Sequence, residues 1–196
     1  MARTIGSSGE KTAKAIREAG IRLIYAHGFE AVGMRQLAAE VGIQPGSLYK
    51  YFANKQTLLF DIVRDHMDHL IVNLHVALEG HQTPLDRLRA FSAFHLRYHM
   101  TRKMQVYIAN SELRSLEPEN RSVIVDMRST YERVVEDILQ SGVDCGAFRP
   151  LDVKVATFAL IALLTGICEW YRADGRLEQD ALVAEHVALV LNGVAR

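Results

Sequence analysis

The stretch "MRQLAAEVGIQPGSLYKYF", residues 34–52, holds two helical patterns around one tight turn. Its apolar positions have the spacing of two short helices, 34–41 and 45–52, joined by "GIQ". Ala38 is small enough for the second helix to cross the first closely, and Gly42 suits the tight turn between them. The segment therefore predicts a helix-turn-helix.

The second helix of this segment predicts a surface that meets a partner. Pro45 is harmless in the first turn of a helix, where its missing N–H would have had no partner. On a helical wheel, packing of Leu48, Tyr51 and Phe52 into the domain turns the opposite face outward. An outward glycine lets the backbone approach another surface closely, and the polar side chains are donors for phosphates and base edges. The outward face and its flanks consist of Gly46, Ser47, Tyr49 and Lys50. We expect this helix to enter a major groove; the alternative is an ordinary helical hairpin with a solvated basic edge.

Charge is distributed unevenly along the chain. The 196 residues carry 23 basic and 23 acidic side chains, but residues 1–55 hold eight basic and four acidic ones. The helix-turn-helix end is therefore positive and the longer remainder negative, which favours an anionic partner for the short end. Cys145 and Cys168 give neither a metal-ligand spacing nor a disulfide framework, which suits a reducing cytoplasm.

No membrane segment is expected. The opening "MARTIGSSGEKTAKAIREAG" has no apolar core, so we expect no signal peptide. The run "VATFALIALLTGIC", residues 155–168, is shorter than the roughly 20 residues that span a bilayer. We therefore interpret it as a buried helix of a cytoplasmic protein.

Helix boundaries recur along the rest of the chain. Asn54 is a suitable N-cap for a helix to Glu79, which at 1.5 Å per residue would be ~39 Å long. Proline or Asp begins each later amphipathic run, and glycine closes the run before it. These starts are Pro84, Pro118 and Asp152, the stops are Gly80, Gly142 and Gly175, and the last run is 178–195. The predicted fold is all α, with about nine helices, no strand and no repeat.

Two stretches of the chain resemble a known family. "MRQLAAEVGIQPGSLYKYFANKQTLL" is similar to the DNA-binding signature of the TetR family of bacterial transcriptional regulators, most strongly over residues 12–60. "SGVDCGAFRP", residues 141–150, resembles that family's glycine-rich link before its last two helices. The resemblance implies a homodimeric repressor of a palindromic double-stranded DNA operator. Its DNA-binding domain would be residues 1–53, and its ligand-binding and dimerisation domain residues 54–196.

The resemblance also assigns DNA contacts. Ser47, Tyr49, Lys50 and Lys55 match contacting residues of the family, Arg35 and Gln44 lie where base contacts often arise, and Gly46 joins them from the helical wheel. For Tyr51 we favour packing beside Leu48. The chain departs from the family at Gly33, where a Thr or Ser cap is usual, and at Gln44-Pro45, where Ser-Lys is common. Both departures lie at the predicted DNA surface, so no base preference is carried over.

The larger domain is expected to hold a small hydrophobic effector. "EWYRADGRLEQDALVAEHVALVLNGV", residues 169–194, resembles the C-terminal stretch of the acyl-CoA-responsive branch of the family. The predicted ligand residues are Met67, Leu70, Phe91, His95, Tyr98, Tyr107, Met127, Arg128, Tyr131, Phe158, Trp170 and Arg172. The alternatives are that these residues simply form a core, or that the effector is a lipophilic or aromatic toxic compound in a regulator of efflux.

The last helices predict the dimer. Residues 153–171 and 182–194 are too apolar to face water as lone helices, so we expect a four-helix interface between two subunits. Its predicted residues are Leu163, Ile167, Tyr171, Val187, Leu189 and Val190. The helix 54–79 begins just after the helix-turn-helix and is the expected lever between effector and DNA.

Two histidine pairs keep a metal-sensing alternative open. His66 with His69, and His95 with His99, each share a helix face, as ligands of a metal between bundle helices would. Neither pair has the Glu-x-x-His pattern of di-iron bundle enzymes, and no Ser-His-Asp order or glycine-rich phosphate loop is present. We therefore expect no enzyme activity, no catalytic residue, no cofactor and no resident metal.

Overall fold

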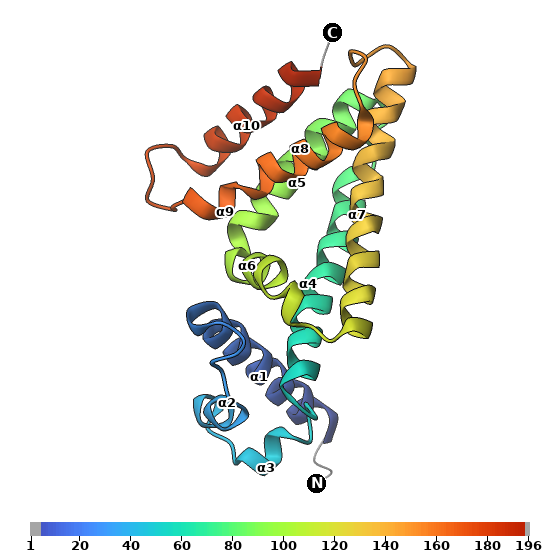
Figure 1. The fold of residues 1–196 in the computed structure, drawn as a ribbon. Coiled ribbons are helices and arrows are strands. Elements are labelled where there is room, and N and C mark those ends of the chain that lie inside the picture. Colours follow the sequence, from blue (N-terminus) through green and yellow to red (C-terminus); the bar gives the residue numbers. More distant parts are fainter. Residues whose placement is uncertain (1–4, 195–196) are drawn as a thin grey trace. The chain divides into compact units, whose positions relative to one another are not determined.

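The computed structural model describes residues 5–194, and within them the fold is all α (Figure 1). The elements are α1 (Ile5–His27), α2 (Met34–Val41), α3 (Pro45–Leu48), α4 (Lys55–Leu78), α5 (Pro84–Thr101), α6 (Lys103–Ser111), the 3-10 turn η1 (Leu113–Ser115), α7 (Pro118–Asp144), α8 (Val153–Thr165), α9 (Ile167–Trp170) and α10 (Gln179–Val194). The predicted fold class is confirmed. Gly166 divides into α8 and α9 what the sequence predicted as one run.

The chain forms two compact units. The first contains the residues up to His66 together with Met104–Ile124, and the second contains Met67–Lys103 together with the residues from Val125 onward. Helices α4, α6 and α7 each continue from one unit into the other. The first compact unit thus extends beyond residue 53, where the sequence predicted a division of the chain. The division into a DNA-binding domain and a ligand-binding domain remains a prediction about function.

The first unit contains the predicted helix-turn-helix. Gly42 ends α2 in the left-handed conformation, with φ 72° and ψ 31°, and the Ile43 N–H donates to the Ala38 carbonyl at 2.9 Å. Ala38 and Leu48 are fully buried where the two helices cross, and Pro45 opens α3. Helices α1 and α4 also approach closely, because a Cβ on Gly20 would lie 3.1 Å from Ile62 Cδ1. Small residues therefore set the close helix crossings of this unit.

The caps that predicted the helix starts are present. Asn54 Oδ1 accepts from the Thr57 N–H at 2.8 Å at the start of α4, and Asp152 Oδ1 accepts from the Val155 N–H at 3.0 Å at the start of α8. Such side-chain acceptors satisfy amides that have no partner inside the helix. The predicted starts of α4 and α8 are confirmed.

The second helix of the motif is shorter than predicted. The prediction ran it from residue 45 to 52, but α3 ends at Leu48 and residues 49–51 form a turn. A wheel drawn at 100° per residue therefore fails beyond Leu48. Phe52 is buried as expected, whereas Tyr51 is 37% exposed, so its predicted packing beside Leu48 is wrong.

Gly142 does not close α7, although the sequence predicted that it would. The helix continues to Asp144, and the chain turns at Gly146, which has φ 75°. A Cβ on Gly142 would lie 2.0 Å from Phe148 Cδ2, because the buried Phe148 ring packs directly on the helix backbone. This glycine serves close packing and not helix termination.

The apolar run at residues 155–168 is not a fully buried helix in the single chain. Val155, Phe158 and Leu163 are 64%, 49% and 48% exposed, and only 28% of residues 153–170 are buried. By length and composition alone these 18 residues pass as a membrane span, which is weak evidence because core helices pass the same test. The predicted buried helix is thus buried on one side only within its own chain, and its other side is exposed.

Candidate nucleic-acid interface and ligand pockets

The first unit presents most of the predicted DNA residues to solvent. Arg35, Gln44, Gly46 and Lys50 are exposed, Tyr49 is 51% exposed, and Ser47 is half-buried. Apart from its chain neighbours and the backbone of its own helix, no atom lies within 4 Å of the position a Cβ on Gly46 would occupy. The α2–α3 segment therefore offers a cationic, hydroxyl-bearing surface with an open backbone position on its short second helix.

Lys55 differs from the other predicted DNA residues. Its ammonium donates to the carbonyls of Phe29 and Glu30 at 3.0 and 3.2 Å, lies 3.6 Å from the Glu30 carboxylate, and sits 4.3 Å from the centre of the Phe29 ring. The sequence offered no sign of these contacts, because they join positions about 25 residues apart. Lys55 is half-buried and its charge is used inside the domain.

In the second unit, several predicted ligand residues form a closed polar-aromatic core. His95 Nδ1 lies 2.8 Å from the Tyr131 hydroxyl, and its Nε2 lies 3.0 Å from the Thr165 hydroxyl. The Phe91 ring packs on both His95 and Tyr131, at centroid distances of 5.6 and 5.7 Å. Met67, Leu70, Phe91, His95 and Tyr131 are buried. These side chains therefore belong to the buried interior of the second unit.

Burial keeps this core uncharged at neutral pH. Desolvation lowers the pKa of His95 well below its ordinary value, with a smaller contribution from His99. Desolvation also lowers the pKa of His99 to about 4, although its hydrogen bond to the His95 carbonyl opposes the shift. The two rings stack 3.7 Å apart, and burial raises the pKa of the Tyr131 hydroxyl. The core is therefore a set of neutral hydrogen-bonding groups.

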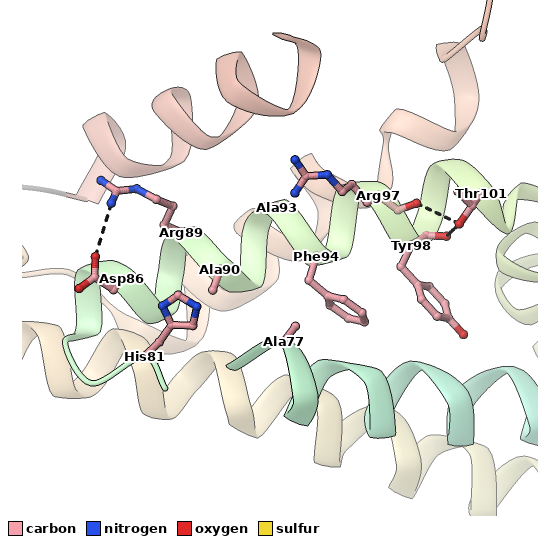
Figure 2. Close-up of a pocket in the computed structure, with 10 residues that line it drawn as sticks. All are labelled: Ala77, His81, Asp86, Arg89, Ala90, Ala93, Phe94, Arg97, Tyr98 and Thr101. Carbon is pink, nitrogen blue, oxygen red and sulfur yellow. Dashed lines mark hydrogen bonds and ion pairs between the residues drawn. The ribbon is translucent and has the colours of Figure 1, made fainter. Parts of the chain in front are cut away.

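An open groove of about 630 Å³ lies along α5, with contributions from the end of α4. It is lined by Ala77, His81, Asp86, Arg89, Ala90, Ala93, Phe94, Arg97, Tyr98 and Thr101. Figure 2 shows Phe94 and Tyr98 pointing to the side of Ala77, whereas Arg89 and Arg97 point to the opposite side of the helix. Both cations already have acidic partners, Asp86 at 3.4 Å and Asp180 at 2.9 Å. The groove therefore offers an apolar, aromatic floor more than a free charge.

A second pocket, of about 240 Å³, lies at the α9–α10 connection. It is lined by Trp170, Tyr171, Arg172, Gly175, Arg176, Leu177 and Leu182. Trp170 is 54% exposed and stacks on the His186 ring at 5.6 Å. Arg172 and Arg176 are exposed, and the described part of the chain provides neither with an ion pair. An exposed indole beside two uncompensated guanidinium groups suits an aromatic anion.

The remaining predicted ligand residues do not join these pockets. Tyr107 belongs to the first unit, where its ring packs edge-on against Tyr25 at 5.1 Å. Phe158 is exposed on α8 beneath the Lys154 ammonium, 4.8 Å from the ring centre. Met127 and Arg128 are half-buried on α7, where burial lowers the pKa of Arg128. Of the twelve predicted residues, only Tyr98 lines the groove, and only Trp170 and Arg172 line the second pocket.

The histidine pairs gather no third ligand. Among residues 5–194, no group of three or more His, Cys, Asp or Glu side chains comes together as a metal site would require. Both ring nitrogens of His95 have hydroxyl partners, and His99 Nδ1 donates to a carbonyl. Sequence spacing alone had suggested these pairs, and the structure uses the His95–His99 pair for packing.

The predicted dimer residues divide into two groups. Leu163 and Leu189 are 48% and 63% exposed, and Tyr171 is half-buried. Ile167, Val187 and Val190 are buried inside the subunit. The exposed large apolar side chains of α8 and α10 are Val155, Phe158, Leu163 and Leu189, which we name the α8–α10 face. Val155 and Phe158 lie within the predicted interface helix 153–171 but were not among its named residues, because the sequence of α8 does not show which side faces outward.

Arg176, and most of the residues that line the α5 groove, were not predicted from the sequence as ligand contacts. Arg176 follows Arg172 by four residues across Gly175, and this short arginine repeat was the available signal. The groove residues on α5 recur at helical spacing from Asp86 to Thr101, with small alanines at its centre. Such a stripe resembles an ordinary solvated face in sequence, so it gave no signal of its own.

Two family models match the chain. The model described as "Bacterial regulatory proteins, tetR family" matches residues 16–62, and the one described as "Tetracyclin repressor-like, C-terminal domain" matches residues 81–194. The first covers the helix-turn-helix and the second covers more than half of the whole chain.

Individual proteins agree with these models. The HTH-type transcriptional repressor KstR2 of Mycolicibacterium smegmatis is 30% identical over 172 residues, covering 86% of this chain and 83% of KstR2. A tetR-family regulatory protein from Rhodococcus RHA1 has a crystal structure similar to this one, with TM-score 0.88, 27% identity, and 94% and 97% of the two chains covered. AibR, solved in complex with isovaleryl coenzyme A and operator DNA, is similar with TM-score 0.84, 27% identity, and 91% and 97% covered.

Proposed function

The chain belongs to the TetR family of bacterial transcriptional regulators, and on that premise we propose a homodimeric repressor that an acyl-CoA releases from its operator. The chain is a TetR-type transcriptional repressor, and its family consists of regulators and not enzymes. Such a regulator acts on chromosomal DNA, so its place is the cytoplasm.

The α2–α3 segment is the proposed DNA contact. Its exposed Arg35, Gln44, Tyr49 and Lys50 supply donors to phosphates and base edges, and Gly46 leaves room for the DNA backbone. Lys55 has a different role in this proposal. Because its ammonium is held by the Phe29 and Glu30 carbonyls, it shapes the domain and is not a free phosphate donor.

A second copy of the chain is the proposed cover of α8 and α10. Isolated large apolar side chains are common on soluble proteins, but a continuous apolar face marks an interface. Val155, Phe158 and Leu163 are exposed on α8 and Leu189 is exposed on α10, and a two-fold pairing of these helices would bury them on both chains at once. A dimer also places two DNA-binding segments on the two halves of a palindrome.

The pocket at the α9–α10 connection is the observation that carries the acyl-CoA proposal. A coenzyme A thioester carries an adenine ring and several phosphates. Adenine stacks on exposed aromatic faces, and guanidinium groups bind phosphate through paired hydrogen bonds. Trp170, Arg172 and Arg176 provide both within one pocket. The AibR complex with isovaleryl coenzyme A supports the same effector class by likeness.

The α5 groove supports a second candidate effector. Its volume of about 630 Å³ lies in the range of small-molecule sites, roughly 300–1,000 Å³. Ala77, Ala90, Ala93 and Phe94 give it an apolar floor, and its arginines are neutralised by neighbouring acids. A neutral lipophilic or aromatic compound would suit this groove without the second pocket, as in a regulator of efflux.

Operator release tests the proposal. A duplex selected from random DNA by the purified protein serves as operator, and its affinity is measured with isovaleryl-CoA, isovaleric acid and a panel of lipophilic aromatic compounds. We expect the thioester to weaken binding at least about tenfold, a coupling of roughly 1.4 kcal/mol, and the free acid to act poorly.

A charge variant identifies the pocket. The double change Arg172→Ala with Arg176→Ala should abolish the response to the thioester, because it removes both uncompensated cations. Arg133→Ala is the matched control, since it removes an exposed arginine of α7 outside both pockets. Equal release by thioester and free acid would overturn the CoA assignment, and release by the aromatic panel alone would favour the efflux alternative.

A further inference from the structure

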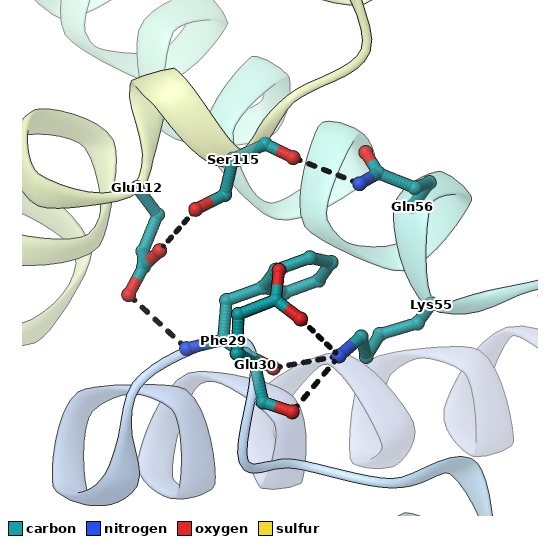
Figure 3. A network of polar contacts seen from close by, with 6 residues as sticks. All are labelled: Phe29, Glu30, Lys55, Gln56, Glu112 and Ser115. Atoms are coloured by element: carbon teal, nitrogen blue, oxygen red, sulfur yellow. Dashed lines mark hydrogen bonds and ion pairs between the residues drawn. The ribbon is translucent and has the colours of Figure 1, made fainter.

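Three segments far apart in the sequence meet in one polar cluster of the first unit (Figure 3). They are the turn after α1 (residues 28–30), the start of α4 (residues 55–56) and the connection from α6 to α7 (residues 112–117). We name this cluster the three-way joint. All of its residues belong to the first unit.

Glu112 holds the turn after α1. Its Oε1 accepts from the Phe29 N–H at 3.1 Å, and its Oε2 accepts from the Ser115 hydroxyl at 2.7 Å. The turn itself is sharp, because Gly28 adopts φ 80° and directs the Phe29 amide out of the helix. A carboxylate that accepts from two donors forms a stronger and more directional link than a neutral acceptor.

Gln56 holds the other side of the connection. Its amide nitrogen donates to the Ser115 carbonyl at 2.8 Å, and its amide oxygen accepts from the Glu117 N–H at 3.3 Å. One side chain thus pairs with two backbone groups of residues 115–117, which fixes the direction as well as the distance of that segment. The start of α4 and the start of α7 are joined in this way.

Lys55 completes the joint at Phe29. Glu112 binds the N–H of Phe29, and Lys55 binds its carbonyl at 3.0 Å. The Phe29 ring is 1% exposed and lies against the same ammonium. Phe29 is therefore anchored through both backbone polar groups and through its ring.

The three-way joint contacts the chain just before and just after residues 34–52, which we name the DNA-contacting segment. Residues 34–52 lie between Glu30 and Lys55, so both ends of that segment are attached to residues 112–117 through Glu112 and Gln56. Residues 112–117 lead directly into α7, which continues into the second unit, as α4 also does. A shift of the α6–α7 connection reaches both ends of the DNA-contacting segment at once.

We propose that Glu112 and Gln56 are positioning residues that set the orientation of the DNA-contacting segment and relay effector binding to it. The proposal rests on the proposed function, because the relay presupposes an effector in the second unit. The orienting role of Glu112 and Gln56 does not depend on an effector, because the contacts of the joint are present without one. A coupled element of this kind must have two arrangements that effector and DNA favour differently.

The test compares Glu112→Ala and Gln56→Ala with wild type in the full chain. Operator affinity is measured with and without isovaleryl-CoA, and thioester affinity is measured separately by calorimetry without DNA. We expect each variant to bind the operator about tenfold more weakly and its thioester response to fall toward onefold. Thioester affinity and dimer mass should stay at wild-type values, which a general loss of structure would not allow.

Conservative and matched variants separate positioning from simple stability. Glu112→Gln keeps an acceptor for the Phe29 N–H and should restore most of the response. Glu119→Ala removes an exposed carboxylate at the start of α7 and should change nothing. Hydrogen exchange of the peptide 25–33 should rise in Glu112→Ala, which reports that the joint is open. If Glu112→Ala does not fold, Gln56→Ala alone decides the question.

Two results are decisive. Wild-type operator affinity and wild-type thioester response in a variant whose 25–33 exchange has risen would overturn the joint. If the thioester does not release wild type from the operator, the effector assignment is wrong and the proposed relay of that effector is wrong with it. The orientation of the DNA-contacting segment is then decided separately, by whether the variants lose operator affinity about tenfold.

Discussion

Two regions of the chain leave large side chains uncovered, and their chemistry is opposite. The DNA-contacting segment exposes Tyr49 by 51% next to the exposed Lys50, whereas α8 and α10 expose Val155 by 64% and Leu189 by 63% without a charge on the same positions. The first surface offers hydrogen-bond donors and positive charge. The second is mainly apolar, with the Lys154 ammonium over the Phe158 ring as its nearby charge. Under the proposed function these surfaces would meet two kinds of partner, a polyanion and a second copy of the chain.

The two surfaces differ in how they behave in water without a partner. A cationic surface is well solvated without its partner, so it is compatible with a free subunit. An apolar surface is not, so a partner chain that covers it would be part of the stable state. We therefore expect the apolar face to be permanently covered and the cationic segment to be covered only on DNA.

The largest expected effect comes from charging the apolar face. Leu189→Glu should convert the dimer to monomer at micromolar concentration, because it places a carboxylate in an apolar interface. Operator binding should fall about a hundredfold, since two half-sites are no longer bound together. Sedimentation and operator titration measure both effects.

The matched control for that change is Val72→Glu. Val72 is 62% exposed on α4, a similar exposure to Leu189, but it lies outside the α8–α10 face. The control should remain dimeric. A dimeric Leu189→Glu, or a monomeric control, would contradict the assignment of the interface.

The next effect, on stability, belongs to the second unit alone. The folded-state pKa of His99 is about 4 and its ordinary value is 6.5, because burial disfavours the charged ring. As the pH falls below 6.5 the unfolded chain takes up this proton first, so the free energy of unfolding falls. The contribution of His99 to this loss should reach about 2 kcal/mol by pH 5, and His95 adds to it in the same direction.

Urea unfolding between pH 7 and 5 measures this dependence. His99→Asn keeps a donor for the His95 carbonyl and removes the titrating ring, so its slope with pH should be shallower by one proton. An unchanged slope would show that His99 is accessible to protons in the folded chain.

The sequence predicted the helix-turn-helix more accurately than it predicted the second unit. Gly42, Pro45 and Asn54 follow local backbone rules, so the helix-turn-helix and the start of α4 were predictable from a few neighbouring residues. Tyr51 was misplaced because the wheel assumed a helix beyond Leu48. Local rules thus predicted the motif, but they did not predict where its four-residue helix ends.

The second unit was harder because its helices are apolar on more than one side. Periodicity did not distinguish Phe158, which is 49% exposed, from Leu160 and Leu164, which are buried. The same reason mixed core residues such as Phe91 with pocket residues such as Trp170 in one predicted ligand set. The contacts of Glu112 and Lys55 join distant segments, and no spacing in the sequence signals them.

A smaller effect tests the cationic surface. Lys50→Ala should weaken operator binding about tenfold and, if Lys50 contacts a phosphate, reduce the salt slope by about one unit. Affinity titrations at several salt concentrations provide the slope, with Arg133→Ala as the control for a lost surface charge. Identical slopes and affinities for Lys50→Ala and wild type would remove α3 from the groove.

The smallest effect has opposite signs in two assays. Gly46→Ala should raise the free energy of unfolding by about 0.5–1 kcal/mol, because alanine loses less entropy in a helix and no atom lies within 4 Å of its Cβ. The same methyl group should weaken operator binding if the backbone approaches DNA there. Gly9→Ala in α1 has equally open surroundings and should stabilise without affecting DNA. Unchanged operator affinity in Gly46→Ala would place the DNA farther from this position.

The mass of the protein–operator complex, with and without effector, shows whether the chain is a dimeric repressor that an acyl-CoA releases. In sedimentation with the selected duplex, we expect an even number of chains per DNA, and we expect isovaleryl-CoA to dissociate that complex into free DNA and protein dimers while isovaleric acid leaves it intact. A complex with a single chain per duplex, or one that persists at saturating thioester, would contradict the account of a dimeric repressor released by an acyl-CoA.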